Sequence, residues 1–125
     1  MIVDTSALIS MLREEPDAEA LRTKLAAAPS ASLSVGTFLE ARIVAARTGN
    51  ESDLRRLLDA AGATVVAFDE RQAEIAYEGF RRYGKGRHPA GLNFGDLFAY
   101  ALARASDEPL LFKRADFALT DVRTA

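Results

Sequence analysis

Cysteine is absent from this chain of 125 residues, and histidine occurs once. Without cysteine there are no disulfides, no thiolate metal sites and no cysteine nucleophile, which fits a reducing compartment. Zinc sites rely mainly on cysteine and histidine, so a zinc site is not expected here. Any metal held by this chain must be bound chiefly through oxygen atoms.

Long apolar runs and a strong net charge are also missing. No apolar run approaches the roughly 18 residues needed to span a bilayer, and the first residues lack the basic region and apolar stretch of a secretory signal. The formal charge of -2 argues against binding nucleic acid through an overall basic surface, although local basic segments remain available. We expect a soluble, cytoplasmic protein with no membrane partner.

Strand-like and helical patterns alternate along the chain. Apolar and β-branched runs predict strands at residues 2–3, 32–35, 63–68 and 110–112. Between them, apolar residues recur at helical spacing. This alternation is typical of βαβ units, and with 49% apolar residues it predicts one α/β domain over residues 1–125, with a mainly parallel sheet covered on both faces.

Four carboxylates stand where strand-like runs end or helical segments begin: Asp4, Glu40, Asp96 and Asp116. Ligands of open α/β sheets bind beyond the carboxyl ends of the strands, so these side chains are expected in one crevice. Like charges repel at short range, so a cation is the expected reason for gathering them. Oxygen ligands suit hard ions such as Mg²⁺ or Mn²⁺, and four acids would serve one or two ions.

Each acid also has a local explanation. The segments Thr37–Glu40 and Asn93–Asp96 both match a capping box or capped first turn, in which the carboxylate serves the start of a helix. Asp4 is a candidate helix cap and Asp116 a candidate Asx turn. Capping and metal binding are compatible. The chemistry that suits such a site is hydrolysis of a phosphodiester by metal-activated water, which needs no protein nucleophile.

Several segments together resemble the PIN-domain ribonucleases, and within them the VapC-type toxins of toxin–antitoxin pairs. The matching segments are Ile2–Leu8, Thr37–Ala41, Tyr83–Asp96, Pro109–Lys113, Asp116–Phe117 and Thr120–Asp121. They cover essentially the whole chain. The resemblance implies a three-layer α/β/α fold, a Mg²⁺- or Mn²⁺-dependent endoribonuclease, a small cognate antitoxin of the VapB type, and a homodimer within a toxin–antitoxin complex.

The resemblance also implies roles for individual residues. By position, Asp4, Glu40 and Asp96 match the core metal ligands and Asp116 matches a fourth acid. The neighbouring hydroxyls are candidates for orienting these ligands or the phosphate, namely Thr5 and Ser6.

One segment departs from the family pattern. Arg114 and Ala115 stand where similar chains have glycine followed by Asp or Asn, and glycine is the residue that reaches positive φ without strain. The loop that carries Asp116 is therefore expected to be placed differently, with Arg114 as a candidate RNA contact.

The densest basic segment precedes the helix that carries Asp96. It contains Arg81, Arg82, Lys85, Arg87 and His88. Lys85 and Arg87 are candidate contacts for RNA phosphates; a solvated loop or an antitoxin contact is the alternative. His88 is read as a surface residue without a catalytic role. Five phenylalanines lie at core spacing and are expected to pack inside: Phe38, Phe68, Phe80, Phe94 and Phe98.

Two other functions compete with the nuclease. A catalytically impaired PIN-like module would bind only RNA or the antitoxin, which the altered loop before Asp116 allows. A phosphoacceptor receiver domain also has acids after its first strand and a lysine after its last, which Lys113 mimics. A receiver needs an acceptor Asp at the end of a middle strand, and residues 32–37 contain none.

Overall fold

The computed structural model describes residues 1–113 and 115–125. In chain order the elements are β1 (Ile2–Val3), α1 (Thr5–Leu12), α2 (Ala18–Ala27), β2 (Ser32–Ser34), α3 (Val35–Arg47), α4 (Glu51–Ala60), β3 (Thr64–Val66), α5 (Glu70–Tyr83), α6 (Phe94–Ser106), β4 (Leu110–Leu111) and the short 3₁₀ helix η1 (Ala115–Leu119). No helix in the described part of the chain has the length and apolar character needed to cross a membrane.

The four strands form one parallel sheet in the order β3-β2-β1-β4. From β1 to β3, each new strand is added at the same edge of the sheet. The chain then crosses back and adds β4 at the opposite edge, beside β1. The point between β1 and β4 is therefore the topological switch of the sheet, where ligands bind in open α/β folds. The predicted parallel α/β architecture is confirmed.

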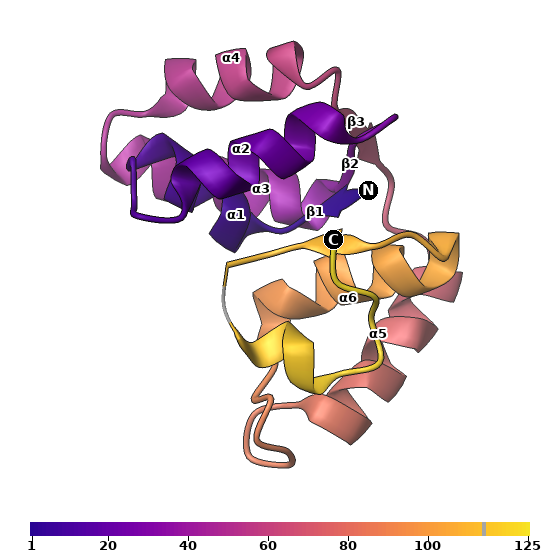
Figure 1. Ribbon diagram of the computed structural model, residues 1–125. Helices are drawn as coiled ribbons and strands as arrows, with labels where there is room; N and C mark the ends of the chain where they lie inside the picture. The colour runs from indigo at the N-terminus through magenta and orange to yellow at the C-terminus, as the bar shows by residue number, and fades with distance from the viewer. Residues whose placement is uncertain (114) are drawn as a thin grey trace.

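Helices cover both faces of this sheet (Figure 1). The helices α1 to α4 lie on one side, and α5, α6 and η1 lie on the other. Side chains of successive strand residues point to opposite faces. Val3 and Leu111 accordingly join the core beneath α1 to α4, whereas Ile2 and Leu110 join the core beneath α5 and α6. Both faces of β1 and β4 are buried, which explains why these two strands read as short apolar runs without polar alternation.

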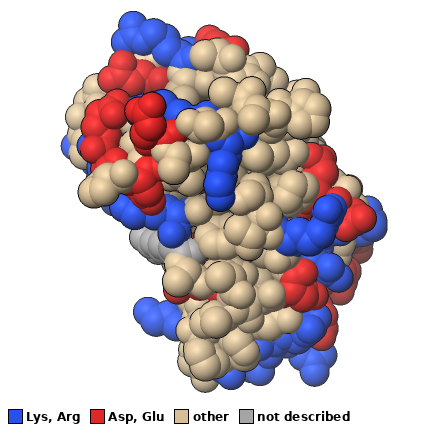
Figure 2. Space-filling model, viewed as in Figure 1, with Lys and Arg blue, Asp and Glu red and all other residues tan. Residues whose placement is uncertain are grey.

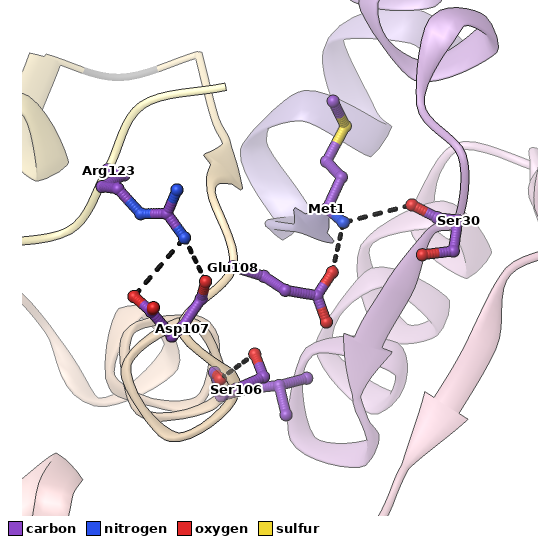
Figure 3. Close-up of polar contacts among 7 residues, drawn as sticks. Met1, Ser30, Ser106, Asp107, Glu108 and Arg123 are labelled. Atoms are coloured by element: carbon purple, nitrogen blue, oxygen red, sulfur yellow. Dashed lines mark hydrogen bonds and ion pairs between the residues drawn. The ribbon is translucent and has the colours of Figure 1, made fainter.

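Ion pairs fasten the chain at the amino ends of the strands. The amino group of Met1 pairs with Glu108 and donates to the carbonyl oxygen of Ser30 at 3.1 Å (Figure 3). In the same view Arg123 pairs with Asp107, 3.4 Å from its carboxylate. The contacts of Met1 join segments that precede β1, β2 and β4, and Arg123 joins the carboxyl-terminal segment to the turn before β4. They lie at the end of the sheet opposite to the predicted acids, so their role is structural.

Helix starts agree with the sequence prediction at two places and differ at one. Asp4 and Asn93 cap α1 and α6 as expected. Asp69 caps α5. The predicted capping box at Thr37–Glu40 is wrong. The cap of α3 is Ser34, whose Oγ accepts from the Gly36 amide at 3.3 Å, so the helix begins at Val35. Glu40 is thereby in the second turn of α3 and is released from a capping role.

The phenylalanine prediction also needs correction. Phe94 is 79% exposed, and the other four phenylalanines are only half-buried. Phe94 begins α6 at a groove of about 560 Å³ between α5 and α6, which Phe68, Tyr77 and Phe80 also line. The helical spacing of these residues correctly predicted that their rings lie on one side of the helices. It did not reveal that no further element within the described chain covers that side.

Candidate functional site

Three of the four predicted acids line one polar pocket. Asp4, Glu40 and Asp96 face a cavity of about 350 Å³ at the carboxyl ends of the strands. Asp4 follows β1, Glu40 comes from α3, and Asp96 from the first turn of α6. The pocket thus lies at the switch point of the sheet, between segments that are far apart in the sequence.

Asp4 is the most buried of these acids, with 3% of its surface exposed. Its amide donates to the carbonyl oxygen of Leu111 at 3.0 Å, which fixes the residue at the end of the β1–β4 pair. Its Oδ2 accepts from the Ser6 amide at 2.9 Å, as the cap of α1. The same carboxylate therefore begins a helix and points into the pocket.

The pKa of Asp4 is raised to about 6, chiefly by burial. The negative charges of Asp96 and Glu40 contribute to this rise, while hydrogen bonds from Ser6 oppose it. A carboxyl group that is kept from water and faces two other acids is costly to ionise. A bound cation would remove that cost, and this is the electrostatic property expected of an oxygen-ligand metal site.

Asp96 is held by a complete capping box. The Asp96 amide donates to Asn93 Oδ1 at 3.0 Å, and Asp96 Oδ2 accepts from the Asn93 amide at 2.9 Å. The prediction of this box is confirmed. Because it fixes a side chain that is only 8% exposed, the helix start presents the carboxylate to the pocket in one orientation.

Glu40 reaches the pocket across the contact between α3 and α6. A Cβ atom at Gly95 would lie 2.0 Å from Glu40 Oε2 and 2.9 Å from its carboxyl carbon. Residue 95 must therefore be glycine if Glu40 is to keep this position. Its lack of a side chain is a requirement of the site, since α6 itself would favour alanine there.

The donors suit a hard cation that keeps much of its water. In the described residues, no three His, Asp or Glu side chains form a ready metal cage. Mg²⁺ does not need one, because it is usually held by one or two carboxylates and several waters. Asp4 with Asp96 or Glu40 meets that requirement, and the polar pocket has room for the waters. The residues present therefore fit Mg²⁺ or Mn²⁺.

Other predicted site residues fall into two groups. Thr5 and Ser6 line the pocket; Thr5 Oγ1 donates to the Thr37 carbonyl at 3.4 Å, and Ser6 Oγ accepts from the Lys113 amide at 3.1 Å. Asp116 lies half-buried in η1 and is not among the described residues that line the pocket. Arg114 lies outside the described residues.

The basic segment before α6 is not part of this pocket's lining. Lys85 borders the apolar groove between α5 and α6, and the guanidinium of Arg87 lies 4.9 Å from the centre of the Phe80 ring. Their contact with RNA remains a prediction. His88 is half-buried, with Nδ1 accepting from the Ala90 amide at 3.0 Å. Asp121 accepts from the Tyr100 hydroxyl at 2.9 Å and pairs with Arg82, so it braces the layer of α5 and α6.

Sequence reasoning missed two cations at the rim of the pocket. Arg13 ends α1 and Lys113 follows β4, and both line the cavity. Arg13 belongs to no local motif, and Lys113, which ends the family-like segment Pro109–Lys113, is not among the predicted site residues. Their position follows from two facts that the sequence alone does not supply: β4 pairs with β1, and α1 runs along the pocket from Asp4.

Comparisons with known proteins agree with this architecture. A family model described as "PIN domain" matches residues 1–122. A ribonuclease VapC of Mycolicibacterium smegmatis is 49% identical, covering 98% of this chain and 97% of the relative. Ribonuclease VapC30 of Mycobacterium tuberculosis is 45% identical, covering 99% and 97%.

Solved structures share the fold at lower identity. A chain from a toxin-antitoxin complex of Klebsiella pneumoniae superposes with a TM-score of 0.75 at 20% identity, over 99% of this chain and 95% of that one. VapC20 of Mycobacterium tuberculosis, described as a sarcin-ricin loop cleaving toxin, gives a TM-score of 0.71 at 17% identity, over 99% and 97%. The three-layer α/β/α prediction is confirmed by the fold and by these likenesses.

Proposed function

The chain belongs to the PIN-domain family and, within it, to the VapC ribonucleases, and we propose that it hydrolyses RNA with water activated by Mg²⁺ or Mn²⁺ in the acidic pocket. The observation that carries the proposal is the burial of Asp4 beside the charges of Asp96 and Glu40 at the switch point of the sheet. Ionising a buried carboxyl group beside other negative charges lowers stability. A divalent cation offsets that cost and supplies the chemistry.

In this mechanism Asp4, Asp96 and Glu40 would hold the ion. When bound, the ion lowers the pKa of a water ligand, orients it and neutralises charge on the phosphate. The chain positions its ligands before the ion arrives. Ser6 fixes Asp4, and the amide of Asn93 fixes Asp96. We keep Asp116 as a proposed fourth acid, which would reach the pocket by movement of η1 or through water.

The direct test is cleavage by the purified protein, freed of any antitoxin. With Mg²⁺ or Mn²⁺ present, it is expected to cut a structured RNA into discrete fragments. Excess chelator is expected to stop the reaction, and restoring the metal to restart it. Undiminished cutting in chelator would reject the metal-dependent mechanism.

Substitution of Gly95 by alanine is expected to disturb the acidic pocket without destabilising the fold. The new Cβ would displace the Glu40 carboxylate, and a misplacement of about 1 Å at a reacting centre can cost on the order of a hundredfold in rate. Alanine is the better helix former, by about 1 kcal/mol. We expect Gly95→Ala to lose cleavage activity, measured as kcat/KM, without a lower Tm. Adding Gly95→Ala to Glu40→Ala is expected to cause little further loss; full activity in Gly95→Ala would contradict the placement of Glu40.

An antitoxin partner is supported by the toxin–antitoxin complexes among the structural neighbours, and we propose one of the VapB type. The catalytically impaired alternative rests on the placement of Asp116 away from the pocket lining. It predicts that the antitoxin-free protein binds RNA without cutting it, so the cleavage test above decides between the two. The receiver-domain alternative is wrong, because the PIN-domain match spans residues 1–122.

We further propose that the chain forms a homodimer. Val35, Leu39 and Ile43 recur on one side of α3 and are each more than 40% exposed, next to the exposed ring of Phe94. A contiguous apolar face of this kind favours association, and two-fold homodimers are the commonest assembly. Leu39→Glu is expected to convert a dimer into a monomer in size-exclusion chromatography with light scattering. An unchanged mass would place the interface elsewhere.

A further inference from the structure

Among the described residues, two cations line the acidic pocket, and their positive charges are neutralised to different extents. Lys113 forms an ion pair with Glu15, and its Nζ lies 3.8 Å from Asp17. Asp17 in turn accepts a hydrogen bond from the buried hydroxyl of Ser10. The ammonium of Lys113 is therefore held between two carboxylates of the α1–α2 turn, and its charge is already compensated.

Arg13 has no such compensation. Its backbone amide donates to the Ile9 carbonyl at 3.0 Å and thereby ends α1, while its side chain is exposed at the pocket. Among the described residues, no carboxylate lies within ion-pair distance of its guanidinium, although Glu14 and Glu15 follow it directly. A guanidinium that has no ion-pair partner and lies at the rim of a pocket lined by acids is suited to an anion that enters the pocket from outside.

The helix α1 sets the spacing between Arg13 and the acids. Asp4 caps its beginning and Arg13 caps its end, with the eight helical residues of α1 between them, so about 13.5 Å of helix rise separates the two along one side of the pocket. The long arginine side chain shortens that gap. A phosphate at Asp4 and the next phosphate of the same strand would therefore meet the acids and Arg13 in turn.

Charge makes such a contact necessary for an RNA substrate. The acids of the pocket repel the phosphate backbone, and Figure 2 shows Lys and Arg interspersed with Asp and Glu over the visible face, with acidic side chains gathered at its upper left and no broad basic surface. Phosphate contacts nevertheless supply most of the affinity for nucleic acid and set its position. The cations that line the pocket are therefore candidates for holding phosphates there.

We propose that Arg13 binds the RNA phosphate next to the scissile one and so sets the position of the strand over the carboxylates. The proposal rests on the proposed function of the pocket as a ribonuclease site. Arg13 acts here in substrate binding and takes no part in the chemical step, whereas Lys113 stays with Glu15 and Asp17.

The salt dependence of RNA binding tests this directly. The probe is a fluorescein-labelled, short, single-stranded RNA of mixed sequence, because a phosphate contact does not depend on the bases. Binding is followed by fluorescence anisotropy in Mg²⁺ with Asp96→Asn as the background, which keeps the RNA intact. We expect Arg13→Gln to weaken binding roughly tenfold, as for a lost charge-assisted contact, and to reduce the slope of log Kd against log salt by about 0.7. Arg13→Lys is expected to keep the slope.

A matched control is Arg55→Gln on α4, which removes the same charge from an exposed residue outside the pocket lining. It is expected to leave the slope unchanged. In the cleaving protein, Arg13→Gln is expected to raise KM and leave kcat within about twofold, as for loss of uniform binding. An unchanged slope in Arg13→Gln, an equal loss in Arg55→Gln, or no RNA binding by the background protein would each overturn the proposal.

The outcome is separable from that of the proposed function. If the unmodified protein cuts RNA but Arg13→Gln keeps its slope and KM, the role of Arg13 fails and the nuclease assignment stands. If the unmodified protein does not cut RNA but Arg13→Gln lowers the slope, the phosphate contact stands and the nuclease assignment fails.

Discussion

Replacing Asp96 by asparagine is expected to reduce metal-dependent RNA cleavage by at least about a hundredfold. Changes in groups that merely orient metal ligands already cost 10- to 100-fold, so the loss of a ligand charge should cost no less. Asparagine retains an oxygen that can accept from the Asn93 amide, so the capping box and the start of α6 should survive. The measurement is kcat/KM for a cleaved RNA, with Tm in chelator to verify folding.

The matched control is Asp59→Asn, which removes one negative charge from an exposed residue of α4. It should leave kcat/KM within about twofold, as expected of a surface change away from the site. Asp116→Asn is an informative third variant, because a loss as large as that of Asp96→Asn would include η1 in the working site. If Asp96→Asn cut RNA as well as the unmodified protein, the acidic pocket would not be the catalytic site.

Replacing Asp4 by asparagine is expected to change the stability of the metal-free protein in a pH-dependent way. Compared with the unmodified protein, the variant should gain more free energy of unfolding at pH 8 than at pH 4. The pKa of Asp4 is about 6 in the folded protein against an ordinary value of 3.8, because burial disfavours its charged form. A raised pKa gives stability that is full below pH 3.8 and is lost as the pH rises through about 6. Asparagine does not ionise, so the variant avoids that loss. It also has an oxygen that can cap α1 through the Ser6 amide.

The quantity to measure is the free energy of unfolding by denaturant in chelator at both pH values. The difference between variant and unmodified protein should shift in favour of Asp4→Asn by about 2.4 kcal/mol from pH 4 to pH 8, at 1.36 kcal/mol per pKa unit, because at pH 4 the unfolded chain is already more than half ionised at this residue. Any fixed cost of burying the amide appears at both values and cancels. A shift of the opposite sign, or none, would show that Asp4 is not destabilised by ionisation.

The charges proposed to bind the metal are also the charges that lower the stability of the metal-free protein. The charged form of Asp4 costs stability in the absence of metal, and Asp96 and Glu40 increase that cost. The same charges are what a divalent cation requires. The substitution that stabilises the empty protein should therefore be among those that remove its activity, as is common where function needs a strained site.

The sequence predicted the parts of the site that depend on local structure. Asn93 and Asp96 are three residues apart, so their capping box is contained in four positions of the chain. Asp4 follows a short apolar strand and precedes helical spacing, which places it at a strand end. The misplaced start of α3 shows the limit of local patterns, because Ser34 competes with Thr37 as a cap and only the end of β2 decides between them.

Features that depend on neighbours far along the chain were not predictable in the same way. The apolar residues that line the groove beside Phe94 have the sequence spacing of a buried helix face. Whether that face is exposed depends on which element covers α5 and α6. Arg13 and Lys113 reach the pocket through the pairing of β1 with β4 and the direction of α1. Arg13 carries no signal in its own sequence environment, and the segment that ends at Lys113 does not show that this side chain reaches the acids.

Calorimetric titration of the purified, antitoxin-free protein with Mn²⁺ tests the central claim most directly, since it measures the ion at the acids without involving RNA. We expect saturable binding by the unmodified protein at near-neutral pH, strong weakening in Asp96→Asn and in Asp4→Asn, and no weakening in Asp59→Asn. Equal binding by all four proteins, or no binding by the unmodified protein at millimolar Mn²⁺, would contradict a metal site at Asp4, Glu40 and Asp96.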